Sequence, residues 1–158
     1  MLDNDPIYQA CIAEALKSPC QKKGVGAVLV SAEHTDATRG HTIIAREHNR
    51  PIEGMESLCQ PTCIRLRIAS RTESMLGSCG HAEERLLWDV TRRGYLAFMP
   101  QLSLYVAGVT DQKVPERRPF PEFTCLRCAV AMHYADLGAI YVAYQGNSWV
   151  RQTPQEAL

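Results

Sequence analysis

Two short motifs rich in metal-ligating residues lie far apart in this chain, and a fold that uses both at one ion must bring them together. The first is His-Ala-Glu at 81–83, and the second is Cys-Leu-Arg-Cys at 125–128. Imidazole and thiolate groups bind zinc, and a catalytic zinc site keeps one position for water whereas a structural site uses four protein ligands. With no evident fourth ligand nearby, the sequence predicts a catalytic zinc bound by His81, Cys125 and Cys128.

A carboxylate accompanies the expected ligands, because Glu83 lies two residues after His81. Placed beside the ion without binding it, this group is suited to act as a general acid and base. Cys125 and Cys128 lie one turn apart at an expected helix start, where the helix dipole favours thiolates. The alternatives are that His81 and Glu83 are ordinary helix-start residues and that the cysteines are buried or redox-active. The conjunction of both motifs favours the catalytic interpretation.

Composition restricts the classes of partner. The 158 residues, 46% of them hydrophobic, fit one domain spanning 1–158. Seventeen basic and 17 acidic residues give a net charge of zero, which disfavours nucleic-acid and membrane-surface binding and favours a small-molecule substrate. The first residues lack a secretory signal, and no apolar run approaches membrane-spanning length, so we expect a cytoplasmic protein. An odd number of cysteines, seven, favours reduced thiols over disulfides.

Hydrophobic periodicity alternates between the periods of helices and strands. It predicts helices over 6–18, 81–94 and 125–137, the last closed by Gly138, and strands over 24–30, 41–45, 102–109 and 139–144. The segment 49–78 is irregular apart from a short helix expected at 64–69, and a loop rich in Pro and Arg covers 113–123. This alternation predicts an α/β/α layered domain with a mixed or parallel sheet.

The two motifs resemble the H-x-E and P-C-x-x-C signature of the zinc-dependent cytidine and deoxycytidylate deaminases. Val-Gly-Ala at 25–27 resembles the first strand of that family, and Asn49 matches the asparagine that contacts the sugar. The likeness extends from the first helix to the last strand, and the deoxycytidylate branch is most similar because it too carries cysteine-bearing loops. The resemblance implies a three-layer α/β/α cytidine-deaminase-like fold with a central mixed sheet of about five strands, and a homo-oligomer.

The resemblance also implies a reaction, the hydrolytic deamination of a cytosine nucleotide, most simply dCMP to dUMP. Zinc would activate water, and Glu83 would shuttle its proton to the ring and to the departing amino group. The backbone at Ala82 would hold the base and Asn49 the sugar, although Asn49 also suits a turn before Pro51. Alternatives are a deaminase of free cytidine nucleosides or another aminated heterocycle, a nucleic-acid base editor, and a zinc-stabilised nucleotide-binding module without turnover.

A phosphate on the substrate would need a cation near this site. Arg50, or the pair Arg117 and Arg118, is the preferred candidate because guanidinium groups bind phosphate through two hydrogen bonds. The chain departs from the family pattern at Thr124, where the family has proline, and we expect the Thr124 hydroxyl to cap the following helix instead. The loop before Thr124 is also longer than the family pattern, which leaves the base specificity open.

Four further cysteines lie in or beside the irregular segments: Cys20, Cys59, Cys63 and Cys79. A second, structural zinc ion bound by these thiols would stabilise a long connection that has little core of its own, and some deoxycytidylate deaminases resemble this arrangement. The alternative is that the four are small buried residues.

Overall fold

The computed structural model describes residues 2–31, 42–63, 66, 79–110, 113–115, 124–144 and 148–156. The strands are β1 (Lys23–Ser31), β2 (Ile43–His48), β3 (Arg50–Pro51), β4 (Cys79–Gly80), β5 (Leu102–Thr110), β6 (Ala139–Tyr144) and β7 (Ser148–Gln152). The α-helices are α1 (Pro6–Lys17), α2 (Ala82–Arg92) and α3 (Leu126–Tyr134). Short 3-10 helices form at η1 (Leu2–Asn4), η3 (Glu56–Cys59) and η6 (Tyr95–Gln101).

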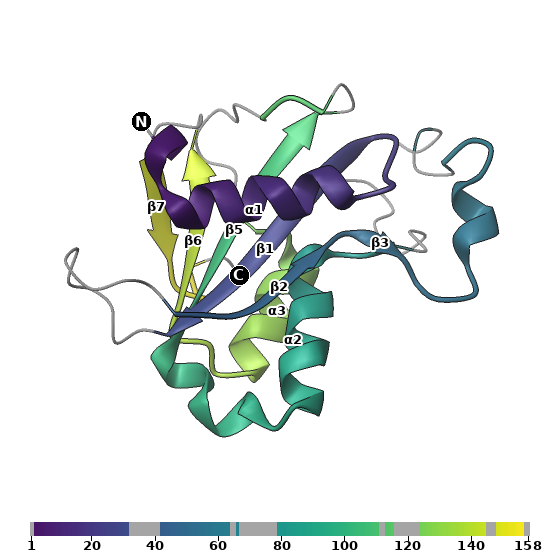
Figure 1. Ribbon diagram of the computed structural model, residues 1–158. Helices are drawn as coiled ribbons and strands as arrows, with labels where there is room; N and C mark the ends of the chain where they lie inside the picture. The colour runs from purple at the N-terminus through teal and green to yellow at the C-terminus, as the bar shows by residue number, and fades with distance from the viewer. Residues whose placement is uncertain are drawn as a thin grey trace.

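A five-stranded mixed sheet forms the centre of the molecule, in the order β2-β1-β5-β6-β7. β5 and β6 are parallel, whereas the other neighbouring strands are antiparallel. α1 crosses one face of this sheet, and α2 and α3 cover the other (Figure 1). The expected three-layer α/β/α architecture with a mixed sheet of about five strands is therefore confirmed.

The sheet has a hydrophobic layer on each face, because β1 and β5 are buried on both sides. Val28 packs into the layer beneath α1, whereas its neighbour Leu29 packs into the layer beneath α2 and α3. Successive side chains of a strand point to opposite faces, so a strand buried on both needs an almost unbroken apolar sequence. This is why the run at 24–30 carries no alternation of polar residues.

α1 lies unusually close to β1 at two glycines. A Cβ atom at Gly26 would stand 2.0 Å from the carbonyl oxygen of Cys11, and one at Gly24 would stand 2.2 Å from that of Ala15. No side chain fits at such distances, so glycine permits the backbone of the helix to approach the strand.

Local signals place the helix ends, with one exception. The Asp5 carboxylate accepts hydrogen bonds from two backbone N–H groups at the start of α1, and Gly94, with φ of 83°, follows α2 as expected. The prediction that α3 extends to Leu137 is wrong, because the helix ends at Tyr134. Asp136 adopts a left-handed φ of 54°, which breaks the helix before the anticipated glycine stop.

Two sheet edges differ from the sequence prediction. β2 spans Ile43–His48 rather than 41–45, since pairing with β1 extends it through polar residues, and His41 lies outside the described residues. β7 was not predicted, and it pairs with β6 through its whole length. Trp149 anchors β7 by donating its ring N–H to Asp5 at 2.8 Å. The short helix expected at 64–69 lies outside the described residues except for residue 66.

None of the helices within the described ranges combines the length and apolar character needed to cross a membrane.

Candidate metal centre

The two sequence motifs meet where α2 and α3 begin. His81 is the residue before the first turn of α2, and Cys125 holds the equivalent position in α3, both with extended backbone conformations. α2 and α3 pack side by side against the same face of the sheet (Figure 1). Because both helices begin at the same end of this layer, their N-termini converge, as the sequence predicted.

The three expected ligands form one compact group. The Nδ1 atom of His81 lies 3.3 Å from Sγ of Cys125 and 3.4 Å from Sγ of Cys128. All three ligand atoms lie within 4.8 Å of one another, and no other trio of His, Cys, Asp or Glu among the described residues is as close. Zinc bonds of about 2.0 Å to nitrogen and about 2.3 Å to sulfur at a tetrahedral angle separate these atoms by about 3.6 Å. The group therefore fits a zinc ion.

Electrostatics at the group support binding of a cation. Hydrogen bonding from Cys128 and from His81 lowers the pKa of Cys125 to about 4. The pKa of Cys128 is raised, because it shares its proton with Cys125 and is buried. Hydrogen bonding to Cys125 also raises the pKa of His81, assisted by the nearby charge of Glu83. A divalent cation at the centre would replace the protons that these three side chains share.

Glu83 and Ala82 occupy the first turn of α2, directly after His81. Both are buried, and the Glu83 carboxylate is near enough to raise the pKa of His81 by its charge. A buried acid two residues after a candidate metal ligand is a candidate for proton transfer at that site. Glu83 therefore lies near the candidate ligands but is not a member of the trio.

An ion pair that the sequence did not indicate joins the two ligand-bearing helices. The Arg127 guanidinium donates to both oxygens of the buried Glu84 carboxylate, with Nη2 lying 2.6 Å from Oε2. Glu84 also accepts a hydrogen bond from the backbone N–H of His81 at 3.3 Å. Arg127 lies between Cys125 and Cys128 in the chain, so this pair connects the two helix starts beside the ligands.

Asn49 lies at the junction of β2 and β3, and its side chain bonds to the β1 backbone. Its Oδ1 accepts from the N–H of Val25 at 2.6 Å, and its Nδ2 donates to the carbonyl of Lys23 at 3.1 Å. Arg50 follows it, pairs with Glu47 at 3.2 Å and remains partly exposed. Asn49 therefore has a structural role at this junction in addition to the sugar contact that the resemblance implies.

Thr124 does not cap α3, so that prediction is wrong. The capping position belongs to Cys125, which makes no side-chain capping bond, and the buried Thr124 hydroxyl has no hydrogen-bond partner among the described residues. Thr124 stands one residue too early in the chain to reach the first free N–H groups of the helix.

The four remaining candidate cysteines lie around the β3–β4 segment. Sγ of Cys59 is 3.7 Å from Sγ of Cys79, while Cys63 is buried and Cys20 partly exposed.

Two of the arginines expected to bind a phosphate, Arg117 and Arg118, lie outside the described residues.

Comparison with protein-family models, curated proteins and solved structures found no match.

Proposed function

We propose that this protein is a zinc-dependent hydrolase that deaminates a cytosine nucleotide, with dCMP as the preferred substrate and dUMP and ammonia as products. The observation that carries the proposal is the convergence of His81, Cys125 and Cys128 beside a buried acid, Glu83. Three ligands leave a tetrahedral ion one position for water, which a purely structural site does not need. The resemblance to the cytidine and deoxycytidylate deaminases supports the choice of reaction.

Glu83 would move the protons of this reaction. A zinc ion held by the trio would lower the pKa of a water molecule towards 7. Glu83 would accept a proton from that water and donate it to the ring nitrogen of cytosine. The hydroxide left by this transfer would add to the ring carbon that bears the amino group. Glu83 would then carry the remaining proton of the added hydroxyl group to the amino group, and the C–N bond would break to release ammonia as the ring carbonyl forms.

The substrate would lie between the first turn of α2 and the junction of β2 and β3. Arg50 is the proposed phosphate contact, since it adjoins Asn49 and its guanidinium is partly exposed. β3 pairs with β4, so Arg50 stands opposite Gly80, the residue before His81. This pairing brings the proposed phosphate contact to the strand that leads into the metal centre.

The proposal is tested by incubating zinc-loaded protein with cytosine, cytidine, deoxycytidine, dCMP, CMP and a short cytosine-containing oligonucleotide, and measuring ammonia and the uracil product. We expect the highest kcat/KM for the nucleotide dCMP. Arg50→Ala should raise KM for dCMP more than KM for deoxycytidine, because only the nucleotide carries the phosphate. Arg92→Ala, an exposed cation at the far end of α2, serves as the matched control.

Each other outcome contradicts a defined part of the proposal. Turnover of deoxycytidine alone would make this a nucleoside deaminase, and turnover of the oligonucleotide alone would make it a nucleic-acid editor. Absence of ammonia from every substrate, with zinc bound, would leave a zinc-stabilised binding module and would refute the hydrolase.

A further inference from the structure

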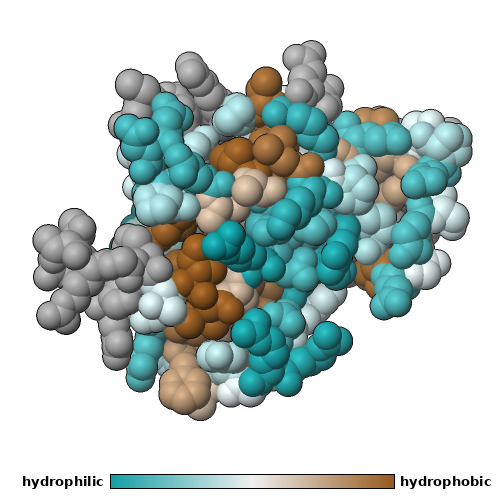
Figure 2. All heavy atoms as spheres, in the orientation of Figure 1, coloured by the Kyte–Doolittle hydropathy of each residue, from teal (hydrophilic) through white to brown (hydrophobic). Residues whose placement is uncertain are grey.

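Two arginines from different elements share one carboxylate where β2, β3 and α2 meet. Glu47, in β2, accepts a hydrogen bond at 3.2 Å from Nη2 of Arg50, in β3, and lies 3.6 Å from Nε of Arg85, in α2. Hydrophilic side chains occupy the surface over β2 and the start of α2 (Figure 2). Because two guanidinium cations face one carboxylate, the group keeps one net positive charge that it can offer to an anion.

Arg85 lies one helical turn after His81 on the same side of α2. Its backbone N–H donates to the His81 carbonyl at 3.0 Å, and residues four apart on a helix are neighbours on its surface. The Arg85 side chain crosses Gly80, where a Cβ atom would stand only 2.9 Å from Cγ of Arg85. Gly80 in turn pairs with Arg50 between β3 and β4. Arg85 is therefore adjacent both to the first metal ligand and to the strand pair that carries Arg50.

Glu47 does not take up all the hydrogen-bonding capacity of the two arginines. The 3.6 Å contact with Arg85 is an ion pair rather than a hydrogen bond, and the buried Nε of Arg85 has no hydrogen-bond partner among the described residues. The Arg50 side chain is 41% exposed. Since a guanidinium group carries five N–H donors, both groups retain donors for a further acceptor.

We propose that Arg85 is a second phosphate contact, which binds the substrate phosphate together with Arg50. The inference rests on the proposed function and narrows its substrate class. A terminal phosphate carries close to two negative charges at neutral pH, and guanidinium groups bind phosphate oxygens through paired N–H donors. Two arginines therefore suit a nucleoside monophosphate, whereas the internal phosphodiester of a nucleic acid carries a single charge.

The alternative is that the ion pair of Arg85 with Glu47 only holds α2 against β2. A purely structural pair would affect every ligand of the site equally, whether or not the ligand carries a phosphate. A phosphate contact would affect only the phosphorylated ligand. The difference in affinity between a nucleotide and its nucleoside therefore separates the two roles.

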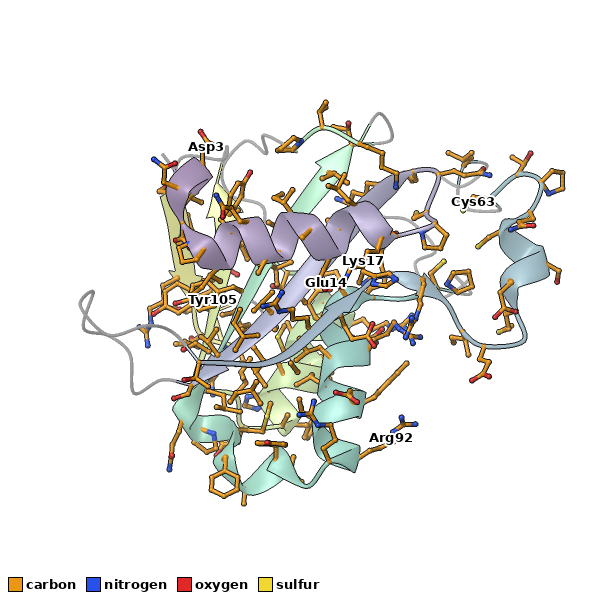
Figure 3. The ribbon with its side chains drawn as sticks, viewed as in Figure 1. Asp3, Glu14, Lys17, Cys63, Arg92 and Tyr105 are labelled. Atoms are coloured by element: carbon orange, nitrogen blue, oxygen red, sulfur yellow. The ribbon has the colours of Figure 1, made fainter. Side chains whose placement is uncertain are left out.

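Calorimetric binding of the product nucleotide dUMP and of its nucleoside, deoxyuridine, to zinc-loaded protein tests the assignment without turnover. Arg85→Ala should weaken dUMP binding about 10-fold or more, because hydrogen bonds to a charged group are lost, and should leave deoxyuridine binding unchanged. Arg85→Lys, which keeps the charge but not the paired donors, should weaken dUMP binding less. Arg92→Ala is the matched control with wild-type binding, since Arg92 projects from the far end of the same helix (Figure 3).

Two results for Arg85→Ala would overturn the proposal: equal weakening of dUMP and deoxyuridine binding, or dUMP binding equal to that of the wild type. A comparison of ligands on the wild-type protein needs no variant to fold. dUMP should bind about 10-fold more tightly than its phosphate methyl ester, which has one negative charge instead of two. Equal binding of dUMP and the ester would also overturn the two-arginine site.

Failure of this contact and failure of the proposed reaction are distinguishable. Ammonia release from dCMP with an unchanged KM in Arg85→Ala would refute the contact and leave the reaction intact. Arg85-dependent binding of dUMP, without ammonia release from any substrate, would keep the contact and refute the hydrolase.

Discussion

At the scale of single residues, the metal centre depends on more than its ligands. Glu84 accepts hydrogen bonds from the Arg127 side chain and from the His81 backbone. One carboxylate therefore connects His81, at the start of α2, to Arg127, which lies in the first turn of α3. Groups that orient metal ligands in this way commonly change metal affinity 10- to 100-fold when they are removed. The Glu84–Arg127 pair is therefore expected to hold the ligands at the spacing that zinc requires.

A double-mutant cycle with Glu84→Gln and Arg127→Ala tests this role. Each single variant should weaken zinc binding by about 10-fold or more, measured by competition with a chelating dye. The loss of zinc-binding free energy in the double variant should be smaller than the sum of the losses in the two single variants, since both substitutions remove the same interaction. Arg93→Ala removes the exposed Arg93–Asp89 pair and should leave zinc affinity unchanged. Additive effects in the cycle would show that the two residues act separately.

At the scale of the elements, the sequence predicted most of what positions the site. Alternating periods and helix caps located α1, α2, β1, β5 and β6, and the spacing of His81, Cys125 and Cys128 identified the trio that the structure brings together. Glu84 and Arg127 were missed because a lone acid and a lone base on different helices carry no local signal. β7 was missed because it is a short edge strand whose residues are mostly exposed or partly buried, so it lacks an apolar pattern.

The contact of α1 with β1 gives a prediction for Gly26. Gly26→Ala should destabilise the protein by about 3 kcal/mol or more, because its added carbon would overlap the backbone of α1 and force the helix away from the sheet. Gly94→Ala is the control, since nothing lies within 4 Å of the added carbon and only the left-handed backbone is strained. It should cost about 1–2 kcal/mol. If urea unfolding gave equal losses of unfolding free energy for Gly26→Ala and Gly94→Ala, the close approach of α1 would not be what excludes a side chain at Gly26.

For the whole molecule, metal binding and folding are expected to be coupled. The ligands come from the starts of two helices that lie far apart in the sequence, so an ion that binds them also joins these helices. Metal that binds only the folded state stabilises it, by about 2.7 kcal/mol when the free concentration is 100 times Kd. The stability of this chain should therefore depend on its zinc content.

Chelation measures that coupling. Removal of zinc should lower Tm by roughly 5–10 °C in a domain of this size, and added zinc should restore it. His81→Ala, which lacks one ligand of the metal centre, should show a smaller shift. An unchanged Tm, with loss of zinc confirmed by elemental analysis, would indicate that the metal does not join the helices.

In the proposed function, Glu83 moves protons beside a zinc ion that it does not bind. The most direct measurement compares zinc content and ammonia release from dCMP in the wild-type protein and in Glu83→Gln, with the exposed Glu53→Gln as control. We expect Glu83→Gln to keep its zinc and to lose about 10²- to 10⁴-fold in kcat, while Glu53→Gln is unaffected. Wild-type turnover by zinc-loaded Glu83→Gln would contradict it.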